Sequence, residues 1–343
     1  MGYYDITDFD RAADEFGAKI RIIFGQRANG KTYQVLKKIL DNSKNGECGL
    51  YVRRWSDDLK ISNIANMFSK HDNTIKYFQH AFYRDKNVVC YTAALTQSEH
   101  FKGTTLPETL TTILLDEFLP EKRELPNEFA HWQSVISTAV RDRTNVNIYL
   151  CGNTVRRVST YFTHYGIDIS KLKKGAISLI KVKQKDGSII KIAVEWCDKN
   201  CEVTRNKNLY FVDIAAQNMI IDGDFEANKH YTNMLDGVSI KNWDKARKLS
   251  LSLLYNKIDY EIRIYNGIFI VKKGRRGKYV FTNVFTDIND GRVYFNTFPF
   301  VAYNQNFTQM QNYFIQNIKQ NHFLAESIEV GEMIQELLNV KGE

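Results

Sequence analysis

The sequence predicts an α/β fold, followed by a second and smaller α+β region. Up to about residue 175, short apolar runs typical of buried strands alternate with stretches of helical spacing. Beyond that point, β-rich segments separated by Gly-containing turn signals take over. The alternation of strand and helix indicates a parallel, doubly wound sheet. We expect a first domain over residues 1–198, a linker over 199–230 and a second domain over 231–343.

The first expected strand, Arg21–Phe24, is an apolar run that ends at Gly25, and a helix with one apolar face follows over Lys31–Leu40. Further strands are expected at Gly49–Val52, Thr111–Leu115 and Val146–Leu150, a hairpin over residues 75–92, and helices over residues 57–68 and from the candidate cap Asn127 to about Arg143. Later turns are expected at Asp186-Gly187, Asn266-Gly267 and Asp290-Gly291, and a helical tail over about residues 306–338.

The charge and the cysteines restrict the class of protein. The chain has 343 residues and a net charge of +8, which favours a polyanionic partner, although a generally basic protein has the same balance. No apolar run approaches the roughly 20 residues of a membrane span, and the polar start Met1–Asp5 argues against a signal peptide. The five scattered cysteines are typical of reduced thiols in a cytosol. Cys197 and Cys201 have no second pair to complete a zinc site.

A glycine-containing loop lies between the first expected strand and the first expected helix. It matches the phosphate-binding pattern G-x-x-x-x-G-K-[ST] in full, with the residues Gly25, Gln26, Arg27, Ala28, Asn29, Gly30, Lys31 and Thr32. The glycines let backbone N–H groups point at phosphate oxygens, and the helix presents its positive N-terminus to the same anion. Lys31 is expected to reach the β- and γ-phosphates of ATP, and the Thr32 hydroxyl to ligate Mg²⁺.

Two adjacent carboxylates follow the expected strand Thr111–Leu115. Asp116 is expected at the carboxyl end of this strand, where Mg²⁺ would lie, and Glu117 can polarise the attacking water as general base. The pair indicates ATP hydrolysis by a fold with an additional strand between the two motifs, and residues 33–115 leave room for that strand. Asn153 follows the next expected strand and is either a sensor of the γ-phosphate or a turn-forming residue.

Arginines near these motifs are candidates for stabilising the charge that develops in phosphoryl transfer, an effect of about 10³–10⁵-fold in some enzymes. The candidates are Arg27, Arg53, Arg54, Arg141 and Arg143. Arg27 lies within the loop and can act in cis. Arg141 and Arg143 end an expected helix, where they can face the nucleotide of a neighbouring subunit or complement the helix dipole.

Together these segments resemble the genome-packaging (encapsidation) ATPases of small protein-primed, short-tailed bacteriophages, which are related to large terminase ATPases within the additional-strand (ASCE) P-loop division. The resemblance covers about residues 20–160, with matching order and spacing of Ile22–Lys31, Tyr51–Arg54, Leu115–Phe118, Val140–Arg143 and Leu150–Asn153. Arg27, three residues before Gly30, resembles the loop arginine of terminases.

The resemblance implies a homopentameric ring on the portal (connector) of an empty capsid, where ATP and Mg²⁺ drive double-stranded DNA inward, and it leaves open whether a packaging RNA takes part. It implies the host cytoplasm, transient attachment to the procapsid, and no membrane. By matching position, Arg141 resembles a trans-acting finger, and Lys122, with Arg123 beside it, resembles a pore contact to DNA phosphates. The family has a basic residue at about the position of His100, and here the lysine, Lys102, comes two positions later. Ser56 stands where a further pore lysine is expected.

The second domain of terminases is an RNase-H-like nuclease whose clustered carboxylates hold two metal ions. Here the stretch Arg263–Tyr265 before Asn266-Gly267 carries no acid, and Asp287 and Asp290 lie near a turn. The resemblance therefore predicts a vestigial RNase-H-like fold without cleavage. The basic stretch Lys272–Lys278 is expected at a hairpin tip, where it binds DNA, a packaging RNA or the portal, or is a solvated turn.

The motifs predict an ATP hydrolase with Glu117 and Arg27 as catalytic residues. The resemblance adds Arg141 as a third, and implies that the protein translocates double-stranded viral DNA into a preformed capsid. Two other functions stay open. Strand separation would favour a DNA-dependent ATPase or helicase unconnected with capsids. Binding of ATP without turnover would favour a non-catalytic, nucleotide-controlled DNA-binding module. A metal-dependent nuclease is a third possibility, which plasmid cleavage in manganese would reveal.

Overall fold

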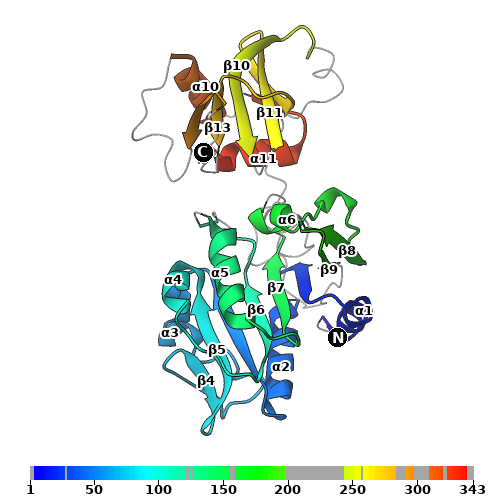
Figure 1. Cartoon of the computed structure of the whole chain (residues 1–343), viewed down its shortest axis with the longest axis vertical. Helices are drawn as coiled ribbons and strands as arrows, with labels where there is room; N and C mark the ends of the chain where they lie inside the picture. Colours follow the sequence, from blue (N-terminus) through cyan, green and yellow to red (C-terminus); the bar gives the residue numbers. More distant parts are fainter. Residues whose placement is uncertain are drawn as a thin grey trace, which may run out of the picture. The chain divides into compact units, whose positions relative to one another are not determined.

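The computed structural model describes residues 4–27, 29–120, 124–125, 127–154, 159–184, 186–197, 243–255, 258–282, 290–296, 309–319 and 323–337. The chain divides into two compact units, Met1–Glu226 and Ala227–Glu343 (Figure 1). The expected linker over residues 199–230 lies outside the described residues. Among the described helices, none combines the length and the apolar character needed to cross a membrane.

The described part of the first unit contains a nine-stranded sheet in the order β3-β4-β5-β2-β6-β7-β1-β9-β8. Its strands are β1 (Ile20–Gly25), β2 (Cys48–Arg53), β3 (Lys76–Phe78), β4 (Ala81–Arg84), β5 (Asn87–Ala94), β6 (Leu110–Asp116), β7 (Asn147–Asn153), β8 (Ile177–Lys183) and β9 (Ile189–Cys197). Neighbours from β5 through β9 pair in parallel, whereas β3, β4 and β8 add antiparallel edges. The predicted parallel sheet is confirmed.

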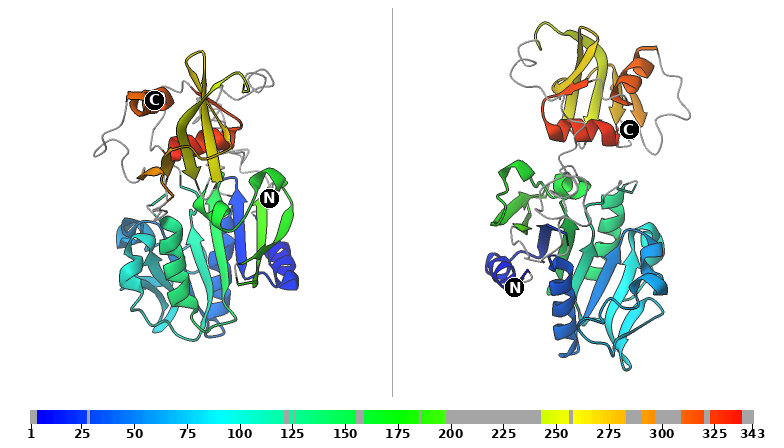
Figure 2. Two further views of the ribbon diagram at one scale, coloured as in Figure 1. Left: turned by 45° about the horizontal axis from the view of Figure 1, so that its top comes forward. Right: turned by 180° about the vertical axis from the view of Figure 1, so that it is seen from behind.

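Helices cover both faces of this sheet. They are α1 (Thr7–Phe16), α2 (Lys31–Ser43), α3 (Ile61–Ile64), α4 (Ser98–Phe101), α5 (Glu128–Val140) and α6 (Thr160–His164), with 3₁₀ turns at Ser56–Leu59, Leu95–Gln97 and Ile169–Lys171. The front and back views place α5 on one face and α2 on the other (Figures 1 and 2). Ile22 and Phe24 of β1 lie in the core beneath α5, and Ile23 lies in the core beneath α2. This alternation is expected for a strand buried on both faces.

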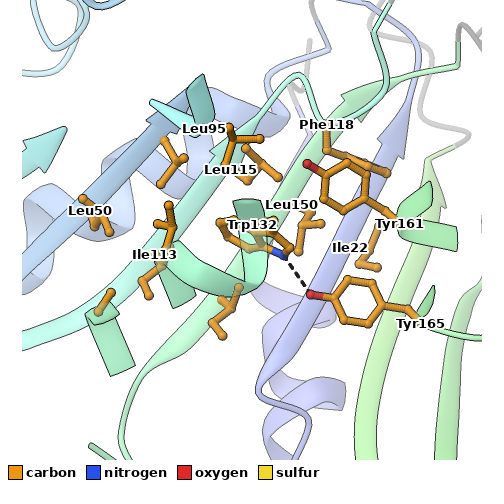
Figure 3. Packing of buried hydrophobic residues seen from close by; sticks show 14 of the residues in the cluster. Ile22, Leu50, Leu95, Ile113, Leu115, Phe118, Trp132, Leu150, Tyr161 and Tyr165 are labelled. Atoms are coloured by element: carbon orange, nitrogen blue, oxygen red, sulfur yellow. Dashed lines mark hydrogen bonds between the residues drawn. The ribbon is translucent and has the colours of Figure 1, made fainter. Parts of the chain in front are cut away.

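The core beneath α5 is organised around Trp132. Its side chain is fully buried among residues of the central strands, including Leu115 and Leu150 (Figure 3). The indole N–H donates a hydrogen bond to the hydroxyl of Tyr165, just after α6, over 2.8 Å. Because a buried indole N–H without a partner would be costly, this bond fixes α5 relative to α6.

A buried arginine joins α1 and α2 to the sheet. Arg21 of β1 is fully buried and donates to Asp10 of α1 over 2.7 Å and to the hydroxyl of Tyr149 of β7 over 2.9 Å. It also pairs with Asp14. Lys38 of α2 reaches the other oxygen of Asp10 over 2.5 Å. The carboxylate of Asp10 therefore connects two helices with the central strand.

The described part of the second unit contains a sheet in the order β14-β13-β10-β11-β12-β15. Its elements are β10 (Arg247–Tyr255), β11 (Ile258–Tyr265), β12 (Ile268–Lys273), β13 (Tyr279–Thr282), β14 (Val293–Asn296), α10 (Gln309–Lys319), β15 (Phe323–Ala325) and α11 (Ile328–Leu337). β11 pairs antiparallel with β10 and β12, whereas β13 pairs in parallel with β10 and β14. Phe314 of α10 packs against Phe269 and Phe281, which holds the helix on the sheet.

Several expected elements differ from the structure. The expected helix over residues 57–68 is a 3₁₀ turn and the short α3, because Lys60 is extended and separates them. The turn at Asp290-Gly291 does not close a hairpin, since β13 and β14 are parallel. The expected helical tail contains β15, which pairs with β12. These errors share a cause: local apolar spacing does not reveal which distant segment a residue will pack against.

Two details around α5 also differ. The strand between β1 and β6 in the sheet is β7, which follows both motifs in the sequence and does not come from residues 33–115. Asn127 occupies the cap position of α5, but its backbone is left-handed at φ 49° and its side chain makes no capping hydrogen bond. The helix ends at Val140 because Arg141 leaves the helical conformation, at φ 43° and ψ −118°.

Replacing Arg21 with Met is expected to lower the free energy of unfolding by about 3 kcal/mol, because the largely buried carboxylate of Asp10 loses its fully buried partner and the hydroxyl of Tyr149 loses a hydrogen bond. Urea denaturation followed by circular dichroism measures this loss. The control is Arg11→Met, which breaks a surface pair with Asp8 whose side chains are 67% and 71% exposed. That change should stay within about 1 kcal/mol. Equal losses in the two variants would contradict the assigned importance of Arg21.

Candidate functional site

The carboxyl ends of neighbouring parallel strands bring the sequence motifs together. β1 ends at Gly25, β6 at Asp116 and β7 at Asn153, and the register pairs Gly25 with Asn153 and Asp116 with Cys151. The glycine loop and the carboxylates therefore lie on either side of the end of β7. Ligands of α/β sheets bind outside such strand ends. The structure thus gathers the loop, both carboxylates and Asn153 at one edge of the sheet.

The glycine loop is held tightly on both sides. Gly25 and Gly30 have positive φ angles of 153° and 98°. A Cβ on Gly25 would lie 2.9 Å from the carbonyl oxygen of Cys197 at the end of β9, so a side chain does not fit. On the other side, the N–H of Tyr4 donates to the carbonyl oxygen of Asn29 over 2.8 Å. A loop fixed in this way presents its N–H groups without reorganisation.

Lys31 begins α2, and its side chain folds back into the loop. It is 4% exposed, and its Nζ donates to the carbonyl oxygen of Gln26 over 2.5 Å and to Oδ1 of Asn29 over 3.1 Å. Oδ1 of Asn153 lies 3.5 Å from the same nitrogen. The ammonium group therefore lies among neutral oxygens inside the loop, where phosphate oxygens are the stronger acceptors.

Thr32 and Asp116 form the part of the site that suits a metal ion. The Thr32 hydroxyl donates to Oδ1 of Asp116 over 2.7 Å. Oδ2 of Asp116 accepts hydrogen bonds from the Tyr51 hydroxyl over 2.9 Å and from Arg53 over 3.3 Å. A hydroxyl and a carboxylate oxygen beside a phosphate loop are the hard donors that Mg²⁺ prefers, with water and phosphate completing its shell. The residues present therefore fit a magnesium–nucleotide complex.

Glu117 follows in a left-handed conformation, at φ 56°, with its side chain half exposed. Its carboxylate accepts a hydrogen bond from Arg53 over 2.7 Å, so Arg53 contacts both acidic residues. Burial alone would lower the pKa of Arg53, but Tyr51, Asp116 and Glu117 raise it above its ordinary value, and the guanidinium stays charged. Among five candidate arginines, the sequence did not distinguish this one, and it did not indicate Tyr51. Knowing that β2 neighbours β6 would have identified both.

The other candidate arginines lie in different places. Arg27 is exposed within the loop. Arg141 is exposed after α5, and its side chain donates to the carbonyl oxygen of Thr104 over 3.1 Å. Because α5 leads from the carboxyl end of β6 back to the amino end of β7, Arg141 lies at the edge of the sheet opposite the loop. Arg143 is largely buried and binds two backbone carbonyls, over 2.9 and 2.6 Å, so its contacts are structural.

The structure describes one of the three expected DNA contacts. Lys102 is exposed after α4 and pairs with Glu99 over 2.7 Å. Lys122 and Arg123 lie outside the described residues, as does Ala28 of the loop. Lys102 lies in the connection from α4 to β6, two residues before Thr104, whose carbonyl oxygen binds Arg141.

In the second unit, the described acids of β11 are engaged by cations. Asp259 pairs with Arg276 over 2.5 Å, and Glu261 pairs with a lysine and an arginine over 2.9 and 2.7 Å. Asp290 is bound by its neighbour Arg292, and Asp287 lies outside the described residues. The described residues of both units contain no group of three or more His, Cys, Asp or Glu side chains able to hold a metal ion.

The basic stretch Lys272–Lys278 is not at a hairpin tip. It connects β12 with β13, which are not neighbours in the sheet. A Cβ on Gly277 would lie 2.4 Å from the carbonyl oxygen of Ser250, so the connection passes directly against β10. Lys273, Arg275 and Lys278 are exposed along it.

The amino-acid sequence is similar to those of known proteins. Residues 14–181 match the podovirus DNA encapsidation protein (Gp16) family. The DNA packaging protein of Bacillus phage PZA is 26% identical over 249 residues, which are 69% of each chain. The DNA packaging protein of Bacillus phage B103 is 29% identical over 163 residues, 44% of this chain, and the matched part spans half (50%) of the B103 protein.

The fold has a solved counterpart as well. The structure described as the Phi-28 gp11 DNA packaging motor superimposes with a TM-score of 0.59 and 19% identity, over 99% of both chains. This similarity establishes the mixed α/β fold of the chain. The sequence match places residues 14–181 in the family of podovirus DNA encapsidation proteins.

Proposed function

We propose that this chain is an ATP-hydrolysing motor that drives double-stranded viral DNA into a preformed capsid, as a ring of subunits on the portal. The supporting observation is the contact between Thr32 and Asp116 over 2.7 Å, beside the buried Lys31 and followed directly by Glu117. A phosphate loop with this carboxylate pair suits a magnesium–nucleotide site that hydrolyses its ligand. The family supplies the context, because its members are described as DNA packaging or encapsidation proteins.

In this proposal the first unit is a P-loop ATPase of the additional-strand division. The position of β7 between β1 and β6 supports this assignment, because the loop and Asp116 then come from strands that are not neighbours. Domain limits of 1–198 and 231–343, with a linker over 199–230, remain our proposal for the organisation of the chain.

The second unit is proposed to be a vestigial RNase-H-like nuclease domain that binds nucleic acid or the portal. Its sheet supports this, since β11 runs antiparallel to its neighbours β10 and β12, and β13 and β14 follow β10 in parallel, as in RNase-H-like sheets. The described strands β10 and β13 carry no Asp or Glu. Two-metal cleavage requires carboxylates around the metal ions, and these central strands supply none.

The residues of the site divide the chemistry among them. The loop Gly25–Thr32 binds the phosphates of ATP, with Lys31 at the β- and γ-phosphates. Thr32 and Asp116 would hold Mg²⁺, which would neutralise charge on the phosphate oxygens. Glu117 takes the proton of the attacking water, and Asn153, which already contacts Lys31, senses the γ-phosphate. Arg27 stabilises the developing charge from within the same loop.

Arg141 is proposed to act on the nucleotide of a neighbouring subunit. It lies at the end of α5, whose 13 residues rise by about 20 Å away from the carboxylate end of the sheet. A side chain at that distance does not reach its own glycine loop. An exposed arginine at an outer edge is instead available to the next subunit of a ring.

DNA is proposed to be held through its phosphates by Lys122, Arg123 and Lys102. The net charge of +8 supports a polyanionic partner. Such contacts bind without sequence preference and weaken as salt rises. The ring, proposed as a pentamer, would work in the host cytoplasm while attached to the procapsid. A packaging RNA is a further partner to be tested with the portal.

Glu117→Gln is expected to lower ATP turnover by about 10²–10⁴-fold without weakening ATP binding, because the amide cannot accept the proton of water. Phosphate release with and without double-stranded DNA measures turnover. The control is Glu108→Gln, since the Glu108 side chain is 91% exposed and distant from the loop in sequence. Nucleotide binding without turnover in the unmodified protein, alone and on portal-bearing capsids, would favour a nucleotide-gated binding module instead.

Arg141→Ala is expected to abolish most turnover, by about 10³-fold or more, if the arginine completes a neighbouring site. Mixing Arg141→Ala subunits with Glu117→Gln subunits should restore part of the activity, because some interfaces then combine an intact Glu117 with an intact Arg141. Arg11→Ala, a change at an exposed arginine of α1, serves as the control. Absence of any complementation across mixing ratios would contradict a trans-acting role.

Thr32→Val is expected to raise the Mg²⁺ concentration that half-saturates turnover by about 10-fold or more, because valine keeps the shape but lacks the ligating oxygen. Turnover at fixed ATP over a magnesium series measures it. Thr138→Val is the matched control, since that hydroxyl only donates to the Ser134 carbonyl within α5, over 3.0 Å. An unchanged magnesium dependence in Thr32→Val would exclude Thr32 as a ligand.

A further inference from the structure

A second arginine lies directly behind the turn that carries Glu117. Arg54 follows β2, and it forms a buried cluster with Glu128, the first residue of α5, and Tyr161 of α6. The side chains of Arg54 and Glu128 are 7% and 0% exposed. The cluster lies outside the glycine loop, and neither its arginine nor its carboxylate has a place in the chemistry described above.

Arg54 divides its donors between a carboxylate and the main chain. Its Nε and Nη2 donate to the two oxygens of Glu128 over 2.7 and 2.8 Å. Its Nη1 donates to the carbonyl oxygen of Glu117 over 3.0 Å, and its Nη2 also donates to the carbonyl oxygen of Phe118 over 3.0 Å. One guanidinium therefore binds two successive peptide carbonyls, the first of which belongs to the proposed general base.

Glu128 is itself fixed, so it holds the guanidinium in one orientation. Its Oε2 accepts from the N–H of Leu125 over 2.6 Å, and its Oε1 accepts from the Tyr161 hydroxyl over 2.8 Å. Burial alone would lower the pKa of Arg54, but its hydrogen bonds and charge interaction with Glu128 raise it, so the arginine stays charged. Bidentate pairing of this kind restricts both distance and plane.

The main chain at Glu117 needs such support. Its φ of 56° is left-handed, which a side chain with a Cβ adopts only when its surroundings require it. The N–H of Phe118 donates to the Cys151 carbonyl of β7 over 3.1 Å, which fixes one side of the following peptide. The two Arg54 hydrogen bonds fix the carbonyl side. Without them, the peptide that joins Glu117 to Phe118 would be held on its N–H side alone, and a change in the backbone angles of Glu117 would move its carboxylate.

We propose that Arg54, oriented by Glu128, is a positioning residue for the hydrolytic step, because it holds the main chain of Glu117 in the one conformation that directs its carboxylate at the attacking water. The inference rests on the proposed ATPase function. A buried ion pair alone is weak support for stability, and an apolar pair of similar volume would often serve as well. An apolar side chain, however, could not donate the hydrogen bonds that Arg54 makes to the carbonyl oxygens of Glu117 and Phe118.

Two variants of the full-length protein test the proposal. Arg54→Lys keeps the charge, but a single ammonium cannot span the carboxylate and both carbonyls. The double variant Arg54→Met, Glu128→Gln removes both charges together, while the amide oxygen of Gln can accept from the N–H of Leu125 and its NH2 group can donate to the Tyr161 hydroxyl oxygen. Arg21→Lys is the matched control, because it makes the same change at a fully buried arginine of β1 that contacts α1 and no residue of the turn.

Each protein is measured for thermal unfolding, affinity for Mg·ADP, affinity for Mg·ADP with aluminium fluoride, and ATP turnover. We expect both Arg54 variants to bind Mg·ADP like the unmodified protein, to lose its preference for the aluminium fluoride complex, and to turn over about 10²-fold more slowly. Arg21→Lys should lower the unfolding temperature and leave turnover and both affinities unchanged.

The outcomes separate this inference from the proposed function. If either Arg54 variant, folded by its unfolding temperature, keeps full turnover and the aluminium fluoride preference, Arg54 is only structural and the inference is overturned. Loss of Mg·ADP affinity in proportion to turnover would overturn it too, since the defect would then lie in nucleotide binding. If the unmodified protein neither hydrolyses ATP nor prefers the aluminium fluoride complex, the ATPase function itself fails and the inference falls with it.

Discussion

The parallel pairing of β1, β7 and β6 is the constraint on which the candidate site depends. Since parallel strands end at the same edge of a sheet, Gly25, Asn153 and Asp116 meet there although they are far apart in the sequence. Packing of α2 and α5 on opposite faces holds these strand ends in place. The packed core therefore fixes the position of the loop relative to Asp116, as expected for a site built on rigid elements.

Two adjacent arginines at the end of β2 bind different groups of the same turn. Successive side chains of an extended chain point to opposite sides. Arg53 therefore reaches the carboxylates of Asp116 and Glu117, whereas Arg54 reaches the carbonyl side of the same turn from within the core. The turn is held by its side chains on one side and by its main chain on the other. A single cation could not do both.

The features that the sequence could predict are those encoded locally. The glycine loop is a contiguous pattern, and the alternation of strands and helices is a local periodicity, so both were recognisable without the structure. The neighbours of each strand depend on pairing between distant segments. For this reason neither the insertion of β7 nor the contacts of Tyr51 and Arg53 could be read from the residues alone. The short α3 likewise depends on the extended conformation of Lys60, which apolar spacing does not reveal.

The insertion of β7 also sets the order in which the molecule can assemble. During synthesis the glycine loop and Asp116 emerge first, but β1 and β6 are not joined until residues 147–153 have been made and form β7 between them. Such a fold is dominated by contacts between distant segments, which slows folding and leaves strand edges exposed in the meantime. A nascent chain that lacks β7 therefore holds both halves of its nucleotide site without the strand that brings them together. The candidate site therefore assembles late, only after β7 joins β1 to β6.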